Sequence, residues 1–124
     1  MARIIQLKTF SDGRGRLNAL DRELPFPIRR VYYIYGVENE DVIRGGHRHH
    51  RNSQALICVQ GKCVISNNDG KLKRKFFLDS PEKCLILEPA DWHTMGHFSK
   101  DAILLVLASE PYDVNDYIDE PYDD

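Results

Sequence analysis

Cysteine is scarce in this chain of 124 residues, and its three cysteines show no CxxC spacing. Cys58, Cys63 and Cys84 each lie within an apolar run, which is typical of reduced thiols in a core and argues against a disulfide framework. No apolar run approaches the ~18 residues that cross a membrane. The first residues also lack the apolar stretch of a secretory signal. We therefore expect a cytoplasmic protein with no membrane partner.

Net charge is also small, because 17 Lys and Arg residues nearly balance 19 Asp and Glu residues. The acids are unevenly placed, since residues 110–124 hold seven of them and no Lys or Arg. The rest of the chain is modestly basic, but this charge does not follow a helix, so we predict no nucleic-acid partner. The acidic end is expected to be solvated.

Helical periodicity is absent before residue 110, and short segments rich in β-branched and aromatic residues recur instead. Asn68-Asp69-Gly70 is a strong hairpin signal, because a type I′ turn needs two residues that tolerate positive φ. Residues 114–118 could form one helical turn. We predict a single all-β domain over residues 1–124, a sandwich or barrel, whose strands cover residues 2–8, 28–35, 55–59, 63–66, 72–78, 84–87 and 102–108.

Histidines cluster between residues 44 and 61, in the run Arg-Gly-Gly-His-Arg-His-His-Arg-Asn-Ser-Gln. On a strand, alternate residues point to one face, so His47 and His49 would project together. Two imidazoles on one wall can be metal ligands or an acid/base pair. Both interpretations are open at this point.

The spacing from Gly45 through His47, His49 and Gln54 to Gly61 resembles the first signature of the cupin superfamily, a small jelly-roll barrel. Pro89 and the pair Trp92-His93 lie where the second cupin signature places its Pro and His. Metal-binding cupins usually have Glu where this chain has Gln54, and a neutral amide is a poor substitute for an anionic oxygen ligand. We therefore expect no metal and no cofactor.

Basic and aromatic side chains surround the histidines in sequence. Arg44, Arg48 and Arg51 flank them, and Arg14 lies in an early turn; clustered guanidinium groups would suit a diphosphate. Three tyrosines alternate within residues 28–35, with Tyr33 and Tyr35 on one face and Tyr32 on the other. A tyrosine that faces the barrel interior could bind a sugar.

Taken together, these pieces resemble the sugar-nucleotide 3,4-ketoisomerases, cupin enzymes that act on dTDP-4-keto-6-deoxyglucose. The matching segments keep one order from residue 12 to residue 118. They include Asp12-x-Arg14-Gly15, Arg30-Val31-Tyr32-Tyr33-Ile34, Arg44-Gly45-x-His47-x-His49, Gln54-x-Leu56-x-Cys58-x-x-Gly61, Trp92-His93-x-Met95 and Asp116-Tyr117-Ile118.

The resemblance implies a metal-independent isomerase that moves the keto group from C4 to C3 through an enediol. It assigns His47 as the catalytic base, with His49 beside it. Candidate substrate-binding residues are Arg14, Tyr33, Tyr35, Arg44, Gln54, Trp92 and His93. It also implies a homodimer that exchanges N-terminal strands, with Ile4 and Leu7 in the interface, and a place in deoxyamino-sugar synthesis for surface glycans such as O-antigen lipopolysaccharide or S-layer glycans.

Some positions depart from the family pattern, among them Arg48, His50, Asn52, Thr94 and the acidic end. They leave the product's C4 stereochemistry and the nucleotide base open. Three alternatives remain: a metal-dependent cupin oxygenase or isomerase, a nucleotide-sugar epimerase of the same fold, and a binding module without catalysis.

Overall fold

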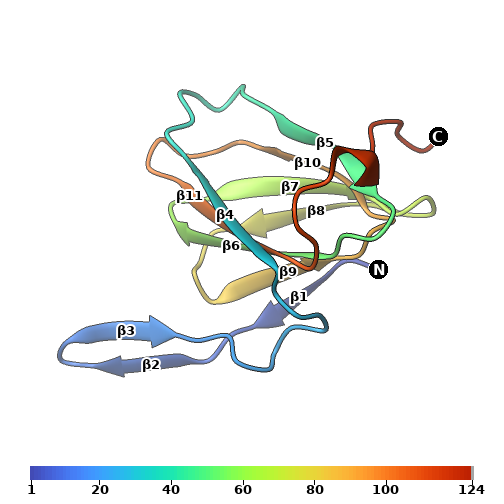
Figure 1. Ribbon diagram of the computed structural model, residues 1–124. Coiled ribbons are helices and arrows are strands. Elements are labelled where there is room, and N and C mark those ends of the chain that lie inside the picture. Colours follow the sequence, from blue (N-terminus) through green and yellow to red (C-terminus); the bar gives the residue numbers. More distant parts are fainter. Residues whose placement is uncertain (124) are drawn as a thin grey trace.

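The computed structural model describes residues 1–123, and almost all of its regular structure is β (Figure 1). A short 3₁₀ helix, η1 (Val114–Asp116), is the only helical element among these residues. The strands are β1 (Arg3–Gln6), β2 (Thr9–Asp12), β3 (Gly15–Asn18), β4 (Arg30–Tyr35), β5 (Arg44–His49), β6 (Gln54–Gln60), β7 (Cys63–Asn68), β8 (Lys73–Leu78), β9 (Lys83–Leu87), β10 (Trp92–Gly96), β11 (Ile103–Ala108) and β12 (Tyr117–Ile118).

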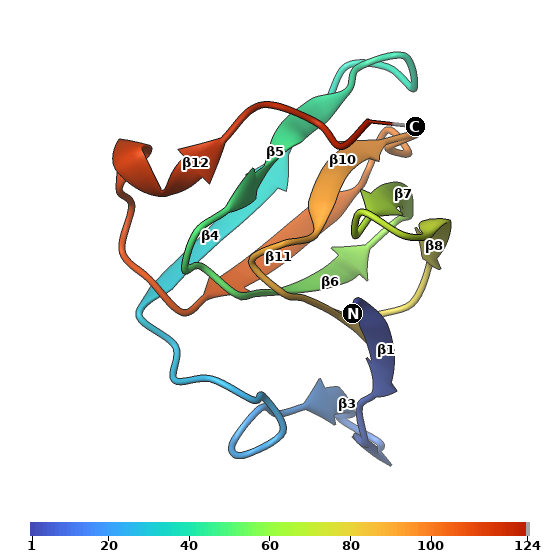
Figure 2. The ribbon, with the colours of Figure 1, turned by 90° about the vertical axis from the view of Figure 1, so that its right-hand side faces the viewer.

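Two five-stranded sheets face each other and form the barrel (Figures 1 and 2). The first sheet has the order β1-β9-β6-β11-β4, and the second has the order β12-β5-β10-β7-β8. All the strand pairs described are antiparallel. The predicted all-β jelly roll is therefore confirmed. No helix within residues 1–123 has the length and apolar character that a membrane crossing requires.

Each strand predicted from residues 28 to 108 is present, with bounds that shift by a few residues. The predicted hairpin joins β7 to β8, but the predicted type I′ turn is wrong, because residues 69–72 connect the paired residues Asn68 and Lys73. Gly70 has a positive φ of 92°, which residues with a Cβ rarely adopt, whereas Asp69 has no positive φ. The expected helical turn at residues 114–118 divides into η1 and β12. The predicted ranges do not include β2, β3, β5, β10 or β12, although the pairing of His47 with His49 supposed a strand at β5.

The apolar core has two parts, one between the sheets and one outside the first sheet. Strand β6 is buried on both faces, because Leu56 and Cys58 point between the sheets while Ala55 and Ile57 pack in the outer cluster. All three cysteines are buried and free, as predicted.

In this structure of a single chain, the N-terminal strand pairs within its own chain, and exchange of this strand with a second subunit stays a prediction. Arg3 to Gln6 of β1 lie antiparallel to β9, with Ile5 opposite Cys84. Of the two residues predicted for the interface, Leu7 is only 3% exposed and belongs to the outer core cluster of its own chain, whereas Ile4 is 37% exposed. The segment that does project from the barrel is the β2–β3 hairpin (Figure 1).

Candidate functional site

One end of the space between the sheets is lined by polar side chains, and we call it the polar end. Strand alternation places these residues inward, and the register across the second sheet aligns His47 with His93 and His93 with Asn67. The polar end comprises His47, His49, Gln54, Asn67 and His93.

His47 lies at the centre of an aromatic cluster. Its ring centroid is 5.1 Å from that of His49 and 5.2 Å from that of His93. The ring of Tyr117 on β12 is 4.7 Å from both His47 and His49, edge to face. The structure thus brings together His47 and His49, as the i, i+2 spacing predicts, and adds His93 from β10.

A buried carboxylate fixes the orientation of His49. Its Nδ1 lies 3.1 Å from Oδ2 of Asp116, and both side chains are almost fully buried. Asp116 also accepts hydrogen bonds from the backbone N–H groups of Arg51 at 2.8 Å and Asn52 at 3.2 Å. Because an ionised carboxylate only accepts, Nδ1 of His49 carries the hydrogen and Nε2 keeps its lone pair.

His93 has the same tautomer for a different reason. Its Nδ1 is 3.1 Å from the carbonyl oxygen of Asp91, which can only accept, so Nε2 of His93 is also an acceptor. The ring is fully buried, and burial lowers the pKa of His93 to about 4.

Burial also keeps the other two imidazoles neutral at pH 7. It lowers the pKa of His47, partly opposed by the charge of Asp119. It lowers the pKa of His49 as well, together with the neighbouring His47, while Asp116 acts in the opposite direction. Burial is the largest cause of the lowered pKa in both residues. Neutral imidazoles can accept protons, as acid/base chemistry requires.

Gln54 lies inside the barrel as predicted, and a tyrosine lies beside it. The Gln54 amide donates to the Tyr32 hydroxyl at 3.1 Å. Arg30 stacks on the Tyr32 ring with its guanidinium 4.5 Å from the centroid. Burial and the neighbouring Tyr117 raise the pKa of Tyr32, and the charges of Arg30 and Arg44 act in the opposite direction.

Two tyrosines predicted to bind the substrate lie outside the polar end. Tyr33 and Tyr35 share one face, as expected, but they are 62% and 69% exposed on the outer side of the first sheet. The interior position belongs to Tyr32, which packs against the core between the sheets. In this chain, Tyr33 and Tyr35 therefore do not face the histidines of the polar end.

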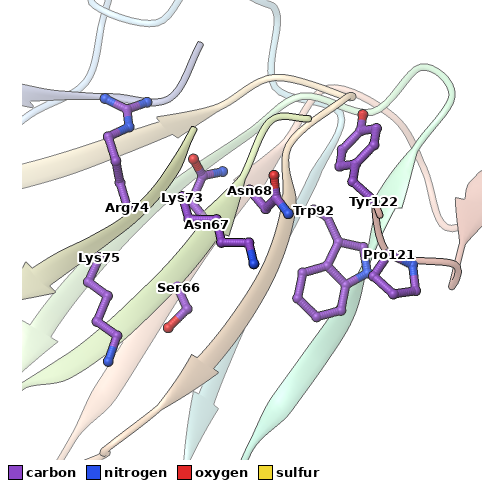
Figure 3. A pocket seen from close by; sticks show the side chains of 9 residues that line it. All are labelled: Ser66, Asn67, Asn68, Lys73, Arg74, Lys75, Trp92, Pro121 and Tyr122. Carbon is purple, nitrogen blue, oxygen red and sulfur yellow. The ribbon is translucent and has the colours of Figure 1, made fainter. Parts of the chain in front are cut away.

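Trp92 and His93 also separate, because neighbours on a strand point to opposite faces. His93 is inside, whereas Trp92 lines a cavity of about 500 Å³ on the outer side of the second sheet. Figure 3 shows Trp92 beside Pro121, with Ser66 and Lys75 on the same side of the sheet. Trp92 is thus not brought together with the histidines.

The arginines do not form one cluster. Arg14 lies at the tip of the β2–β3 hairpin and pairs with Asp12 at 2.7 Å. Arg51 pairs with Asp113 at 3.1 Å, and Arg48 donates to the backbone oxygen of Glu120. Arg44 begins β5 opposite Met95 of β10.

The sequence reasoning missed several residues of the site. Asp116, Tyr117 and Arg30 were noted only as parts of matching segments. The usable signal was the Asp-Tyr-Ile segment itself, which follows the last core strand by a short loop.

The polar end holds several side chains of the types that bind metal ions, among them three histidines. Within residues 1–123, no group of three His, Cys, Asp or Glu side chains is arranged to hold a metal ion. Nδ1 of His49 and Nδ1 of His93 are both engaged by protein oxygens. The arrangement suits proton transfer between imidazoles and a carbon acid.

Comparison with known proteins gives consistent matches over nearly the whole chain. The model of the FdtA family, described as WxcM-like, C-terminal, matches residues 1–123. A TDP-4-oxo-6-deoxy-alpha-D-glucose-3,4-oxoisomerase from Aneurinibacillus thermoaerophilus is 42% identical over 118 residues, which are 94% of this chain and 84% of that protein.

Solved structures agree with this match. The WlaRB TDP-quinovose 3,4-ketoisomerase from Campylobacter jejuni is 41% identical with a TM-score of 0.92, covering 96% of this chain and 92% of that one. A mutant of the 3,4-ketoisomerase QdtA from Thermoanaerobacterium thermosaccharolyticum, in complex with TDP-4-keto-6-deoxyglucose, is 36% identical with a TM-score of 0.91 and covers 96% and 87%. The chain belongs to the FdtA family of WxcM-like, C-terminal domains.

Proposed function

We propose that this chain is a sugar-nucleotide 3,4-ketoisomerase that converts dTDP-4-keto-6-deoxyglucose into its 3-keto isomer. The observation that carries the proposal is the group of three neutral imidazoles at the polar end, two of them in contact with Tyr117. The substrate class comes from family relatives whose names and complexes specify TDP sugars.

The reaction needs a base at C3 and a proton donor at C4. In the proposed mechanism His47 takes the C3 proton, and the electron pair moves onto the C4 carbonyl to give an enediol. C4 then receives a proton relayed by His49 or Tyr117, and the oxygen at C3 becomes the carbonyl as its proton passes to the oxygen at C4. No atom is gained or lost. A positioned acid/base group contributes about 10²–10⁴ in rate.

We also propose that the reaction needs no metal. Gln54 occupies the position of a carboxylate ligand, and its amide nitrogen donates to Tyr32. A neutral amide oxygen is a weak ligand for iron or manganese beside histidines.

Isomerisation in deuterated water tests the proposal. The protein is incubated with dTDP-4-keto-6-deoxyglucose, with and without EDTA, and the sugar is followed by NMR. We expect a 3-keto product with deuterium at C4 in both samples. A parallel incubation in ordinary water keeps the proton at C4, and its coupling constant to the C5 proton then gives the stereochemistry.

Each other result indicates a different protein. Inversion at C3 or C5 without a keto shift would indicate an epimerase. Loss of turnover in EDTA, restored by one divalent metal, would indicate a metalloenzyme. Binding with no proton exchange would indicate a binding module.

The oligomeric state is a second part of the proposal. Phe10 and Leu17 face each other across the projecting hairpin, and both side chains are exposed. Val31, Tyr33 and Tyr35 form an exposed apolar row on the edge strand β4. Exposed apolar rows of this kind are typical of interfaces, and we propose that a second copy covers them in a homodimer.

Sedimentation velocity tests this part. Phe10→Ser with Leu17→Ser should convert the dimer into monomer, whereas Val114→Ser, at an exposed position on η1, should not. A wild-type protein that sediments as a monomer would contradict the dimer.

Free buried cysteines accord with a reducing compartment. We propose that the enzyme acts in the cytoplasm, in deoxyamino-sugar synthesis for surface glycans.

A further inference from the structure

Several polar atoms at the polar end are buried and have no hydrogen-bond partner within the described residues. They are Nε2 of His49, Nε2 of His93, Oε1 of Gln54 and both amide atoms of Asn67. Buried polar groups in native proteins are almost always hydrogen-bonded, so a cluster of exceptions calls for an explanation. The explanation must supply donors and acceptors inside the barrel.

Asn67 differs from the other members, because both of its polar atoms lack a partner. It is 3% exposed and follows Cys63 and Ile65 on the inward face of β7. Its direct neighbour on β10 is His93. Asn67 takes no part in the proton transfers proposed above.

The neighbour of Asn67 on the other side does not satisfy it. Arg74 lies opposite Asn67 on β8, but its guanidinium donates to the carbonyl oxygen of Ala2 at 2.8 Å and lies over the Phe76 ring. The amide is therefore kept next to the imidazole cluster, with its hydrogen-bonding capacity unused. Leaving a buried amide unpaired destabilises a fold.

An amide is suited to this reaction for a chemical reason. It offers both a donor and an acceptor, whereas a carboxylate only accepts and an ammonium only donates. The reaction exchanges a carbonyl and a hydroxyl on adjacent carbons. The same amide can donate to the carbonyl and accept from the hydroxyl.

We propose that Asn67 is a substrate-binding residue that hydrogen-bonds the sugar ring beside His93 and so selects the sugar part of the nucleotide sugar. This inference rests on the proposed ketoisomerase function and extends it to a residue on β7. The ligand recognised is a hexose oxygen. The nucleotide and its diphosphate are not part of this contact.

The substitution Asn67→Leu should weaken binding of the substrate without lowering the stability of the fold. Asn67→Leu replaces the amide with an apolar side chain of similar size. KM for dTDP-4-keto-6-deoxyglucose should rise about tenfold, because the sugar loses a hydrogen bond inside a buried site. The melting temperature should stay the same or rise, because an unpaired buried amide has been removed. The Kd for TDP alone should be unchanged.

Ser66→Ala is the matched control. Ser66 precedes Asn67 on β7, and its side chain points to the other side of the sheet (Figure 3). It should change neither KM nor the melting temperature. Asn67→Ala, which cannot overpack the barrel, repeats the comparison if the leucine variant folds poorly.

The outcomes separate the competing explanations. An unchanged KM with a lower melting temperature would show that Asn67 holds an ordered water only, and would overturn the inference while wild-type turnover upholds the ketoisomerase function. Equal weakening of TDP and of the TDP sugar would place Asn67 at the nucleotide and also overturn it. A wild-type protein that binds the TDP sugar without isomerising it would overturn the function and the inference with it.

Discussion

The two ends of the barrel interior differ sharply, although the same strands build both. On β6 the side chains that face the space between the sheets are Gln54, Leu56 and Cys58 in chain order. On β7 they are Cys63, Ile65 and Asn67. Because these strands are parts of antiparallel sheets, the polar residues gather at one end and the apolar residues at the other. We call this second part the apolar end.

The apolar end is built for stability and the polar end is not. Leu56, Ile65, Leu104 and Cys58 are fully buried with no polar atom to satisfy except the thiol, and that thiol bonds a backbone oxygen. The polar end buries five polar atoms without partners. Unpaired buried groups reduce stability, so the polar end is retained for binding and chemistry.

The largest effect is expected from His47→Asn at the polar end. Removing the proposed base should lower kcat by about 10²–10⁴, while the Kd for TDP stays within about threefold because the imidazole acts on the sugar. Steady-state assays measure kcat, and isothermal titration calorimetry with TDP measures the Kd. A variant that turns over at the wild-type rate would refute the assignment of His47.

At the apolar end, Leu56→Ala should have the converse effect. Leu56 is fully buried and lies opposite Leu85 and Val106 on the neighbouring strands. The cavity should lower the free energy of unfolding by about 2–5 kcal/mol, as measured by urea denaturation. KM at 25 °C should stay at the wild-type value. A raised KM with unchanged stability would show that the two ends are not separable.

The pH dependence of stability should come from the polar end. The pKa of His93 is lowered to about 4 in the folded protein, against about 6.5 in an unfolded chain. Between these values the unfolded state binds a proton that the folded state does not. Stability is therefore full above pH 6.5, falls by about 3 kcal/mol as the pH falls toward 4, and levels off below.

Urea denaturation at pH 7.5, 5.5 and 4.5 checks this expectation. His93→Gln removes the titrating group and should give a shallower dependence than the wild-type protein. If the free energy of unfolding falls with pH equally in the two proteins, His93 is not the cause of the pH dependence. His47 and His49 act in the same direction, since burial lowers the pKa of both.

Much of the fold could be predicted from local sequence, and the exceptions have physical causes. Strands β6, β9 and β11 are apolar runs, and such runs are recognisable. Strand β10 reads Trp-His-Thr-Met-Gly, and its inward His93 replaces the apolar residue that would have marked it. The β2–β3 hairpin is largely exposed, so it carries no alternation of buried and exposed residues.

The alternation of side chains along a strand predicts only part of the site. Alternation correctly pairs His47 with His49 and Tyr33 with Tyr35, but it does not tell which face points inward. Which face of β4 points inward depends on the strands that cover each face, and in the structure the inward face carries Tyr32. The contact between His49 and Asp116 spans 67 positions in sequence, so no local pattern could reveal it.

The smallest effect is expected for Asp116→Asn, which tests how the polar end is held in place. Asp116 accepts from His49 and from two backbone N–H groups, and an amide cannot accept at both of its ends. The orientation and tautomer of His49 should become less well defined, and kcat should fall about tenfold to a hundredfold with little change in KM. Asp116 acts to raise the pKa of His49, so the acidic limb of the pH–rate profile should move to lower pH.

Asp79→Asn provides the control, because Asp79 is an exposed carboxylate paired with Lys83 at 2.8 Å, outside the polar end. It should alter neither kcat nor the pH profile. A purely structural role for Asp116 would lower the melting temperature and the amount of active enzyme, but it would leave the limb of the profile where it is. A shifted limb with a reduced kcat would instead show that the carboxylate acts through His49, and that the polar end depends on a residue of the short helix η1.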